Sequence, residues 1–171
     1  MTRADVVIRP EQRGDHAEIA ALLTAAFDGP AEADLVMRLR DDNDIALALL
    51  AVANGGEIVG HIACPRLQLV QAERRIPVVG VAPLAVAPAR QRSGIGGALM
   101  AASLERLRQQ GEALVFVLGD PAYYTRFGLS LAVAEPFASD YAGPHFMALA
   151  LRPDAPASGR LVYPRAFSDL G

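Results

Sequence analysis

The sequence has little cysteine, little net charge and no long apolar run, and each scarcity excludes a class of protein. With one cysteine in 171 residues, no internal disulfide bond is possible, which favours a reducing, cytoplasmic location. No stretch of about 18 uncharged apolar residues is present to predict a membrane span. The apolar run after Asp5 is too short for a secretory signal peptide.

Charge and residue types argue against two further kinds of partner. The formal net charge of -3 leaves no broad basic surface for nucleic acid, and no clustered Cys/His pattern predicts a metal site. A hydrophobic fraction of 52% and a charged fraction of 20% are ordinary for a soluble globular protein. We therefore expect residues 1–171 to form a single domain with a substantial core.

Hydrophobic periodicity, interrupted by glycine and proline, predicts the order of strands and helices. The predicted strands span 5–10, 45–53, 57–70, 74–86, 113–118, 131–134 and 146–151, and the predicted helices span 15–27, 32–39, 94–110 and 122–127. This order predicts an α+β fold with one mixed sheet and helices on both faces. Residues 152–171 are expected to form a mostly irregular tail, anchored by Leu161, Val162, Tyr163 and Phe167.

Local signals refine three points of this scheme. Asp15, with Glu18 three residues later, predicts a capping box at the start of the first helix. Residues 54–56 predict a hairpin turn. The strand 74–86 is apolar on both faces and is expected to be buried on both. Because Pro83 cannot donate to a strand ladder, this strand should bulge there or part from a neighbour.

The stretch that organises the chain is the glycine-rich turn between the strand 74–86 and the long helix. Gly94, Gly96 and Gly97 leave backbone amides uncovered where the helix begins. Such amides, together with the positive end of the helix dipole, favour a bound phosphate, and Arg90 and Arg92 add positive charge beside them.

Two interpretations of this turn differ in the ligand. A dinucleotide fingerprint, G-x-G-x-x-G/A, fits Gly94 and Gly96, with Asp120 as the ribose-binding acid, but Leu99 occupies the third small position. The pattern Q/R-x-x-G-x-G/A is filled by Gln91, Gly94 and Gly96. The three strands before the turn favour the second interpretation, because the fingerprint normally opens a run of alternating strands and helices.

That pattern, the order of elements over residues 5–151, and a downstream Tyr-x-Arg-x-Gly at residues 124–128 resemble the GCN5-related N-acetyltransferase (GNAT) superfamily, in its YhbS-like branch. The resemblance implies the GNAT fold, whose mostly antiparallel sheet splays apart between its fourth and fifth strands, here 74–86 and 113–118. It also implies acetyl-CoA as co-substrate and an amine as acceptor, either a small molecule or a peptide. A homodimer is plausible from the resemblance alone.

The resemblance assigns cofactor contacts residue by residue. Amides of the turn would hold the pyrophosphate, the pantetheine arm would pair with the exposed strand end, and an amide near Val86 would polarise the thioester carbonyl. The cofactor-binding residues expected on this basis are Leu84, Ala85, Val86, Gln91, Arg92, Ser93, Gly94, Ile95, Gly96 and Gly97.

Catalysis requires a neutral amine and a protonated leaving thiol. The resemblance gives the acid role to Tyr124, with its neighbour Tyr123 as the alternative. The strand over 76–86 contains no carboxylate to act as base. The identity of the base is therefore left open: it could be a bound water or His61, or the amine could arrive neutral and need no base. A histidine in such a strand is more often a hydrogen-bonded core residue than a catalytic base, and this applies to His61. A lone cysteine such as Cys64 is usually a core residue rather than a nucleophile.

The acceptor itself is not specified by the sequence. Asp28, Glu32 and Asp34 would suit a cationic acceptor, although such charges are usually only solvated. Asp120 is expected to cap the helix that follows it more often than to touch a ligand. Two alternative functions remain: a catalytically silent CoA-binding sensor module, and a nucleotide-dependent oxidoreductase.

Overall fold

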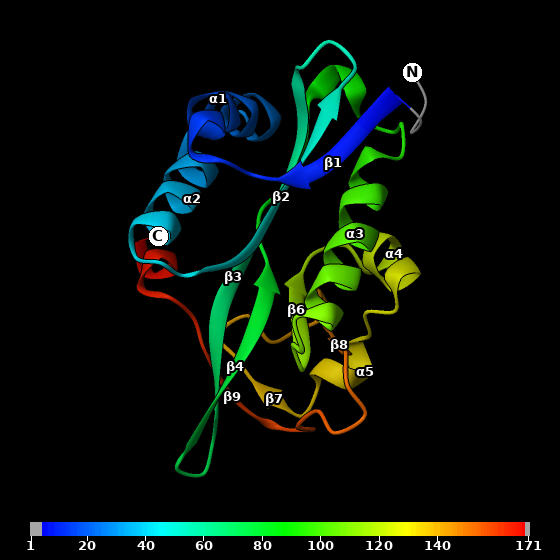
Figure 1. Ribbon diagram of the computed structural model, residues 1–171. Helices are drawn as coiled ribbons and strands as arrows, with labels where there is room; N and C mark the ends of the chain where they lie inside the picture. The colour runs from blue at the N-terminus through cyan, green and yellow to red at the C-terminus, as the bar shows by residue number, and fades with distance from the viewer. Residues whose placement is uncertain (1–4, 170–171) are drawn as a thin grey trace.

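The computed structural model describes residues 5–169, which fold around one mixed sheet (Figure 1). Its main path runs β1, β2, β3, β4, β6, β8, while β5 and β9 pair with β3 and β7 pairs with β9. All pairs are antiparallel except β4 with β6 and β7 with β9. This confirms the predicted mixed, mostly antiparallel sheet. The strands are β1 (Val6–Pro10), β2 (Ile45–Ala53), β3 (Ile58–Gln71), β4 (Arg74–Val81), β5 (Leu84–Val86), β6 (Leu114–Leu118), β7 (Phe137–Ala138), β8 (Phe146–Ala150) and β9 (Gly159–Val162).

Helices cover both faces of the sheet, as predicted. In Figure 1, α1 and α2 lie together on one side, in blue, and α3 lies on the other, in green. Ile19 and Leu23 of α1 pack on Leu50 of the sheet, while Leu99 of α3 belongs to the cluster that contains Ile62 on the opposite face. The helices are α1 (His16–Phe27), α2 (Ala31–Asp41), α3 (Ile95–Gln109), α4 (Pro121–Tyr124) and α5 (Leu131–Ala134).

The strand predicted over residues 74–86 is divided at Ala82 and Pro83 into β4 and β5. β4 pairs with β3 along one edge and, at residues 79–81, with β6 along the other. β5 keeps its pairing with β3, but no described residue of β6 pairs with it. Proline has no amide hydrogen to donate, so the ladder is interrupted at this point. The predicted splaying of the sheet is therefore present.

The prediction that this strand is buried on both faces is right for only part of it. Residues 78–81 are buried. Arg74 and Arg75 are exposed, because the hairpin of β3 and β4 extends past the helices (Figure 1). The predicted turn at residues 54–56 is confirmed as the connection between β2 and β3.

Residues 131–134 form the helix α5, so the strand predicted there is wrong. Ser130 begins the helix: its Oγ accepts a hydrogen bond from Val133 N at 3.3 Å. The residues that follow Ser130 form an apolar run of four, which is too short for its periodicity to separate a strand from a helical turn.

The prediction of a mostly irregular tail at 152–171 misses two regular elements among the described residues. β9 pairs with β3, with Leu161 opposite Leu69, and a 3₁₀ turn follows at Arg165–Asp169. Leu161 is buried, which confirms it as an anchor, and Ala166 packs against buried leucines of α2. Figure 1 shows this turn, in red, beside α2. Residues 170–171 lie outside the described part.

The capping box predicted at Asp15 is absent from the start of α1. The Asp15 carboxylate instead accepts hydrogen bonds from the Arg9 guanidinium at 2.8 and 2.9 Å and from Gln12 N at 2.7 Å. The bonds from Arg9 lower the pKa of Asp15 to about 2. Glu18 Oε2 accepts a hydrogen bond from Ile58 N at 2.9 Å, which joins α1 to the start of β3.

The docking of the C-terminal segment can be tested at Gly159. Gly159 begins β9 at a φ of +143°, and a Cβ there would lie 2.7 Å from Leu69 Cδ1 and 3.0 Å from the carbonyl oxygen of Val70. Gly143 has a similar φ of +153° but nothing within 4 Å of its Cβ position. We expect Gly159→Ala to lower the free energy of unfolding by about 2 kcal/mol more than Gly143→Ala, because only Gly159 adds a clash to the strain. Urea unfolding measures both, and equal losses would contradict the packing of β9 on β3.

Candidate active site

The turn before α3 presents backbone amides that can bind an anion. Gly94 occupies the N-cap position at a φ of +88°, and α3 begins at Ile95. The amides in the first turn of a helix have no acceptor inside that helix, and the positive end of the helix dipole adds to their attraction for an anion.

A cavity of about 560 Å³, here called the turn cavity, lies at this place. Its lining includes seven of the ten residues that the sequence predicts for cofactor binding: Val86, Gln91, Arg92, Gly94, Ile95, Gly96 and Gly97. Gln91 Nε2 donates a hydrogen bond to the Val86 carbonyl at 3.2 Å. The basic turn is thereby joined to the end of β5.

The other three predicted residues have different surroundings in the described structure. Ser93 Oγ donates a hydrogen bond to the carbonyl of Arg90. Leu84 lines a second cavity, and the buried Ala85 packs in the cluster beneath α1. Any contact of Ala85 with a cofactor would therefore have to come from its backbone.

Three arginines line the turn cavity: Arg90 and Arg92, which the sequence indicates as its positive charge, and Arg126. The Arg126 guanidinium carbon lies 4.5 Å from the centre of the Tyr123 ring, and its Nε donates a hydrogen bond to the Tyr123 carbonyl at 3.1 Å. In the sequence, Arg126 stands out only as the arginine of Tyr-x-Arg-x-Gly. The three-residue spacing from Tyr123 was a signal that both residues share one helical face.

Gly96 permits the close approach of α4 to α3. A Cβ at Gly96 would lie 2.7 Å from the Tyr123 hydroxyl oxygen, so no larger residue fits unless Tyr123 moves. Tyr123 consequently lines the turn cavity.

A second cavity of about 310 Å³, here called the gap cavity, lies where the sheet parts. It is bordered by residues 80–84 at the end of β4 and the start of β5, and by residues 116–118 of β6. Leu84 at one end of β5 lines the gap cavity and Val86 at the other end lines the turn cavity. The unpaired edge of β5 therefore runs from one cavity to the other.

Tyr124 lines the gap cavity. A Cβ at Gly119 would lie 2.5 Å from Tyr124 Cε2, so this glycine gives the ring its space. Burial raises the pKa of Tyr124 to about 12, which keeps the hydroxyl protonated at neutral pH and able to donate its proton. The two tyrosines, whose ring centres are 4.9 Å apart, thus face different cavities: Tyr123 faces the turn cavity and Tyr124 faces the gap cavity.

The acidic residues that the sequence associates with an acceptor are separated by the structure. Glu32 lines the gap cavity, whereas Asp28 and Asp34 are exposed and lie outside its lining among the described residues. Asp120 caps α4, since its Oδ1 accepts a hydrogen bond from Ala122 N at 2.9 Å.

His61 and Cys64 lie in the core and line neither cavity among the described residues. The ring nitrogens of His61 make no hydrogen bond within the described part of the chain, although Nε2 lies 3.5 Å from Glu11 Oε2. His61 is therefore a core histidine, as the sequence favours, and its polar neighbour is the Glu11 carboxylate. Burial raises the pKa of Cys64 to about 12, which leaves an unreactive thiol.

Residues 5–169 offer neither a metal cluster nor a membrane-spanning helix. No group of three or more His, Cys, Asp or Glu side chains in this range is placed to hold a metal ion. No helix in the same range has the length and apolar character needed to cross a membrane.

Comparison with known proteins agrees with this geometry. Residues 7–132 match the family described as an acetyltransferase (GNAT) domain. The N-acetyltransferase YhbS of Escherichia coli K12 is 40% identical over 127 residues, which are 74% of this chain and 75% of YhbS. The chain belongs to the GNAT acetyltransferase family. A second relative, the N-acetyltransferase YjhQ of the same strain, is 39% identical over 130 residues, which are 75% of this chain and 68% of YjhQ.

Solved structures extend the likeness of this GNAT acetyltransferase to almost the whole chain. E. coli YhbS in complex with CoA superposes with a TM-score of 0.88 at 35% identity, over 98% of this chain and 94% of that one. A GNAT acetyltransferase of Brucella melitensis in complex with acetyl-CoA superposes with a TM-score of 0.80 at 34% identity, over 95% of this chain and 97% of that one. The predicted family, fold and acyltransferase class are confirmed, and the oxidoreductase interpretation of the glycine turn is wrong.

The cap of α4, which carries Tyr123 and Tyr124, can be tested at Asp120. Asp120→Ala is expected to lower the free energy of unfolding by about 1 kcal/mol, because the Ala122 amide loses its acceptor. Asp120→Asn should retain most of that energy, since its side-chain oxygen can accept the same bond. Urea unfolding distinguishes the variants, and a fully stable alanine variant would contradict the capping role.

Proposed function

We propose that this GNAT acetyltransferase moves the acetyl group of acetyl-CoA to a primary amine, which attacks the thioester directly while both substrates are bound. The observation that supports this most strongly is the unpaired edge of β5, which joins an amide-rich, arginine-lined turn to a protonated tyrosine. Two structural relatives that bind CoA or acetyl-CoA support the choice of donor.

Each part of acetyl-CoA has a matching group in this arrangement. The turn amides of residues 92–97, with three arginines nearby, suit the pyrophosphate. The edge of β5 suits the pantetheine arm, whose amides can pair with a strand as a further peptide would. The thioester would then lie at the gap cavity, where a backbone amide of β5 would polarise its carbonyl.

The reaction forms one bond and breaks another. The nitrogen of the neutral amine attacks the carbonyl carbon, the C–N bond forms, and the C–S bond breaks. Tyr124 gives its proton to the departing sulfur, and the proton released from the amine restores the tyrosine. The products are an N-acetylated amine and CoA with a free thiol.

The proposed function is tested by incubating the chain with acetyl-CoA and a broad panel of amines. Release of the CoA thiol, together with the acetylated product seen by mass spectrometry, is the expected result. Binding of acetyl-CoA without transfer to any amine would instead support a silent CoA-binding module.

Gly96→Glu tests the placement of the donor. The carboxylate would bring negative charge and bulk into the turn cavity, so binding of CoA should fall at least 100-fold by isothermal titration calorimetry. Gly55→Glu, in the exposed β2–β3 turn with nothing within 4 Å of its Cβ position, should bind CoA like the original chain. Unchanged affinity in Gly96→Glu would show that the site is elsewhere.

Tyr124→Phe tests the acid. It should lower kcat about 100-fold, within the range of general acid catalysis, while the Kd of CoA stays within twofold. Tyr123→Phe should retain kcat because its hydroxyl faces the turn cavity. Since the pKa of Tyr124 is raised to about 12, the proton should remain available and kcat should show no decline up to pH 10. Full activity of Tyr124→Phe at every pH would remove Tyr124 from the mechanism.

A further inference from the structure

The gap cavity has an unusual lining. The chain has six phenylalanines, four tyrosines and no tryptophan, and six of these aromatic side chains surround this one space: Phe27, Phe116, Tyr124, Tyr141, Tyr163 and Phe167. They come from five separate parts of the chain, so the fold alone brings them together. A small, largely apolar cavity with six aromatic side chains in its lining favours a ligand with a flat apolar body.

Only one charged side chain lines the cavity among the described residues, and it is Glu32 of α2. Glu32 is half-buried, and its carboxylate makes no hydrogen bond or ion pair with another described residue. The lining includes no described arginine or histidine. The cavity therefore offers a negative charge without a positive one to balance it.

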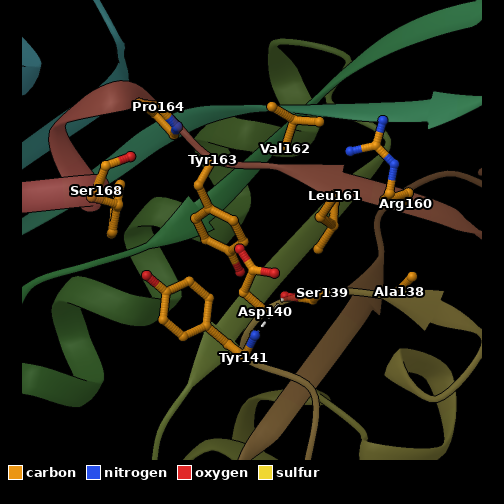
Figure 2. A pocket seen from close by; sticks show the side chains of 11 residues that line it. Ala138, Ser139, Asp140, Tyr141, Arg160, Leu161, Val162, Tyr163, Pro164 and Ser168 are labelled. Carbon is orange, nitrogen blue, oxygen red and sulfur yellow. Dashed lines mark hydrogen bonds between the residues drawn. The ribbon is translucent and has the colours of Figure 1, made fainter. Parts of the chain in front are cut away.

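Three of the aromatic residues, Tyr141, Tyr163 and Phe167, form a continuous wall, here called the aromatic wall. The ring centres of Tyr141 and Tyr163 are 4.8 Å apart at 72°, and those of Tyr163 and Phe167 are 5.3 Å apart at 66°. The same three residues line a neighbouring cavity of about 440 Å³. Figure 2 looks into that cavity and shows the rings of Tyr141 and Tyr163 near each other, with Asp140 beside them.

The aromatic wall carries no positive charge and remains neutral. Burial raises the pKa of Tyr163 to about 12, and the nearby carboxylate of Asp140 acts in the same direction. A neutral aromatic ring keeps the negative face that attracts a cation. A carboxylate and neutral aromatic rings around one cavity together favour an organic ammonium ion and disfavour an anion.

We propose that the acceptor is a primary ammonium ion on an aromatic or similarly flat apolar body, without an anionic group. Glu32 pairs with the ammonium, which loses one proton to water before the neutral amine attacks, and the aromatic wall contacts the body. This inference rests on the proposed function, which it deepens by naming the acceptor class. It also gives a role to the C-terminal segment, since the aromatic wall lies beyond residue 132, where the match to the family ends.

Three ligands with one body and different charge test the proposal on the CoA complex of the full chain: phenethylammonium, 2-phenylethanol and 3-phenylpropanoate. Binding is measured by isothermal titration calorimetry or ligand-observed NMR. Phenethylammonium should bind at least tenfold more tightly than the alcohol and the carboxylate. Equal binding of the three, or no binding of phenethylammonium, would overturn the proposal.

Variants identify the residues responsible. Glu32→Gln should weaken the binding of phenethylammonium at least tenfold and change the Kd of 2-phenylethanol by less than twofold. Asp34→Asn, which removes an exposed carboxylate from the same helix, should change neither. Tyr163→Leu should weaken the binding of phenethylammonium more than that of the alcohol. If this variant does not fold, Glu32→Gln still tests the proposal. Unchanged binding in Glu32→Gln would contradict the pairing.

Turnover separates this inference from the proposed function. Phenethylamine should be acetylated with at least tenfold higher kcat/KM than phenylalanine, which adds a carboxylate to the same body. If phenylalanine and other anionic amines are the better substrates, acetyl transfer stands and the acceptor class is wrong. If phenethylammonium binds through Glu32 but no amine is acetylated, the cation site stands and acetyl transfer is wrong.

Discussion

The interruption of one strand ladder is the constraint on which the rest of the site depends. β5 keeps its hydrogen bonds to β3, but β6 pairs only as far as residues 79–81 of β4. Proline at position 83 cannot extend a ladder on both edges. A continuous ladder would pair the edge of β5 with β6 and fill the gap cavity, so an extended ligand could not lie along that edge.

The two ends of this open edge have different chemistry. At Val86 the basic glycine turn and the start of α3 offer amides and arginines to an anion. At Leu84 the surroundings are apolar and aromatic, with Tyr124 kept protonated by burial. The uncovered amides and arginines are thus separated from the buried tyrosine by the length of β5, as the proposed division between donor binding and catalysis requires. The adjacent tyrosines lie at different ends of this edge: Tyr123 lies over Gly96 in the turn cavity, and Tyr124 lines the gap cavity.

Much of this arrangement could be predicted from the sequence, because its signals are local. A few neighbouring residues are enough to interpret the glycines before a helix, the proline late in an apolar strand and the tyrosine within Tyr-x-Arg-x-Gly. The errors have non-local causes. β9 is a strand because β3 extends far enough to pair with it. Asp15 does not cap α1 because its carboxylate binds Arg9 and the Gln12 amide instead.

The lining of the gap cavity illustrates the same limit. Tyr141, Tyr163 and Phe167 are far from Glu32 in the chain, and no short motif joins them. Their common position depends on β9 and the final 3₁₀ turn, both of which were predicted as an irregular tail.

A crystal structure of the chain with acetyl-CoA is the most direct test of the central claim. We expect the pyrophosphate on the amides of residues 92–97, the pantetheine arm along β5, and the thioester sulfur within hydrogen-bond distance of the Tyr124 hydroxyl. A donor bound away from β5, or a sulfur remote from Tyr124, would contradict it.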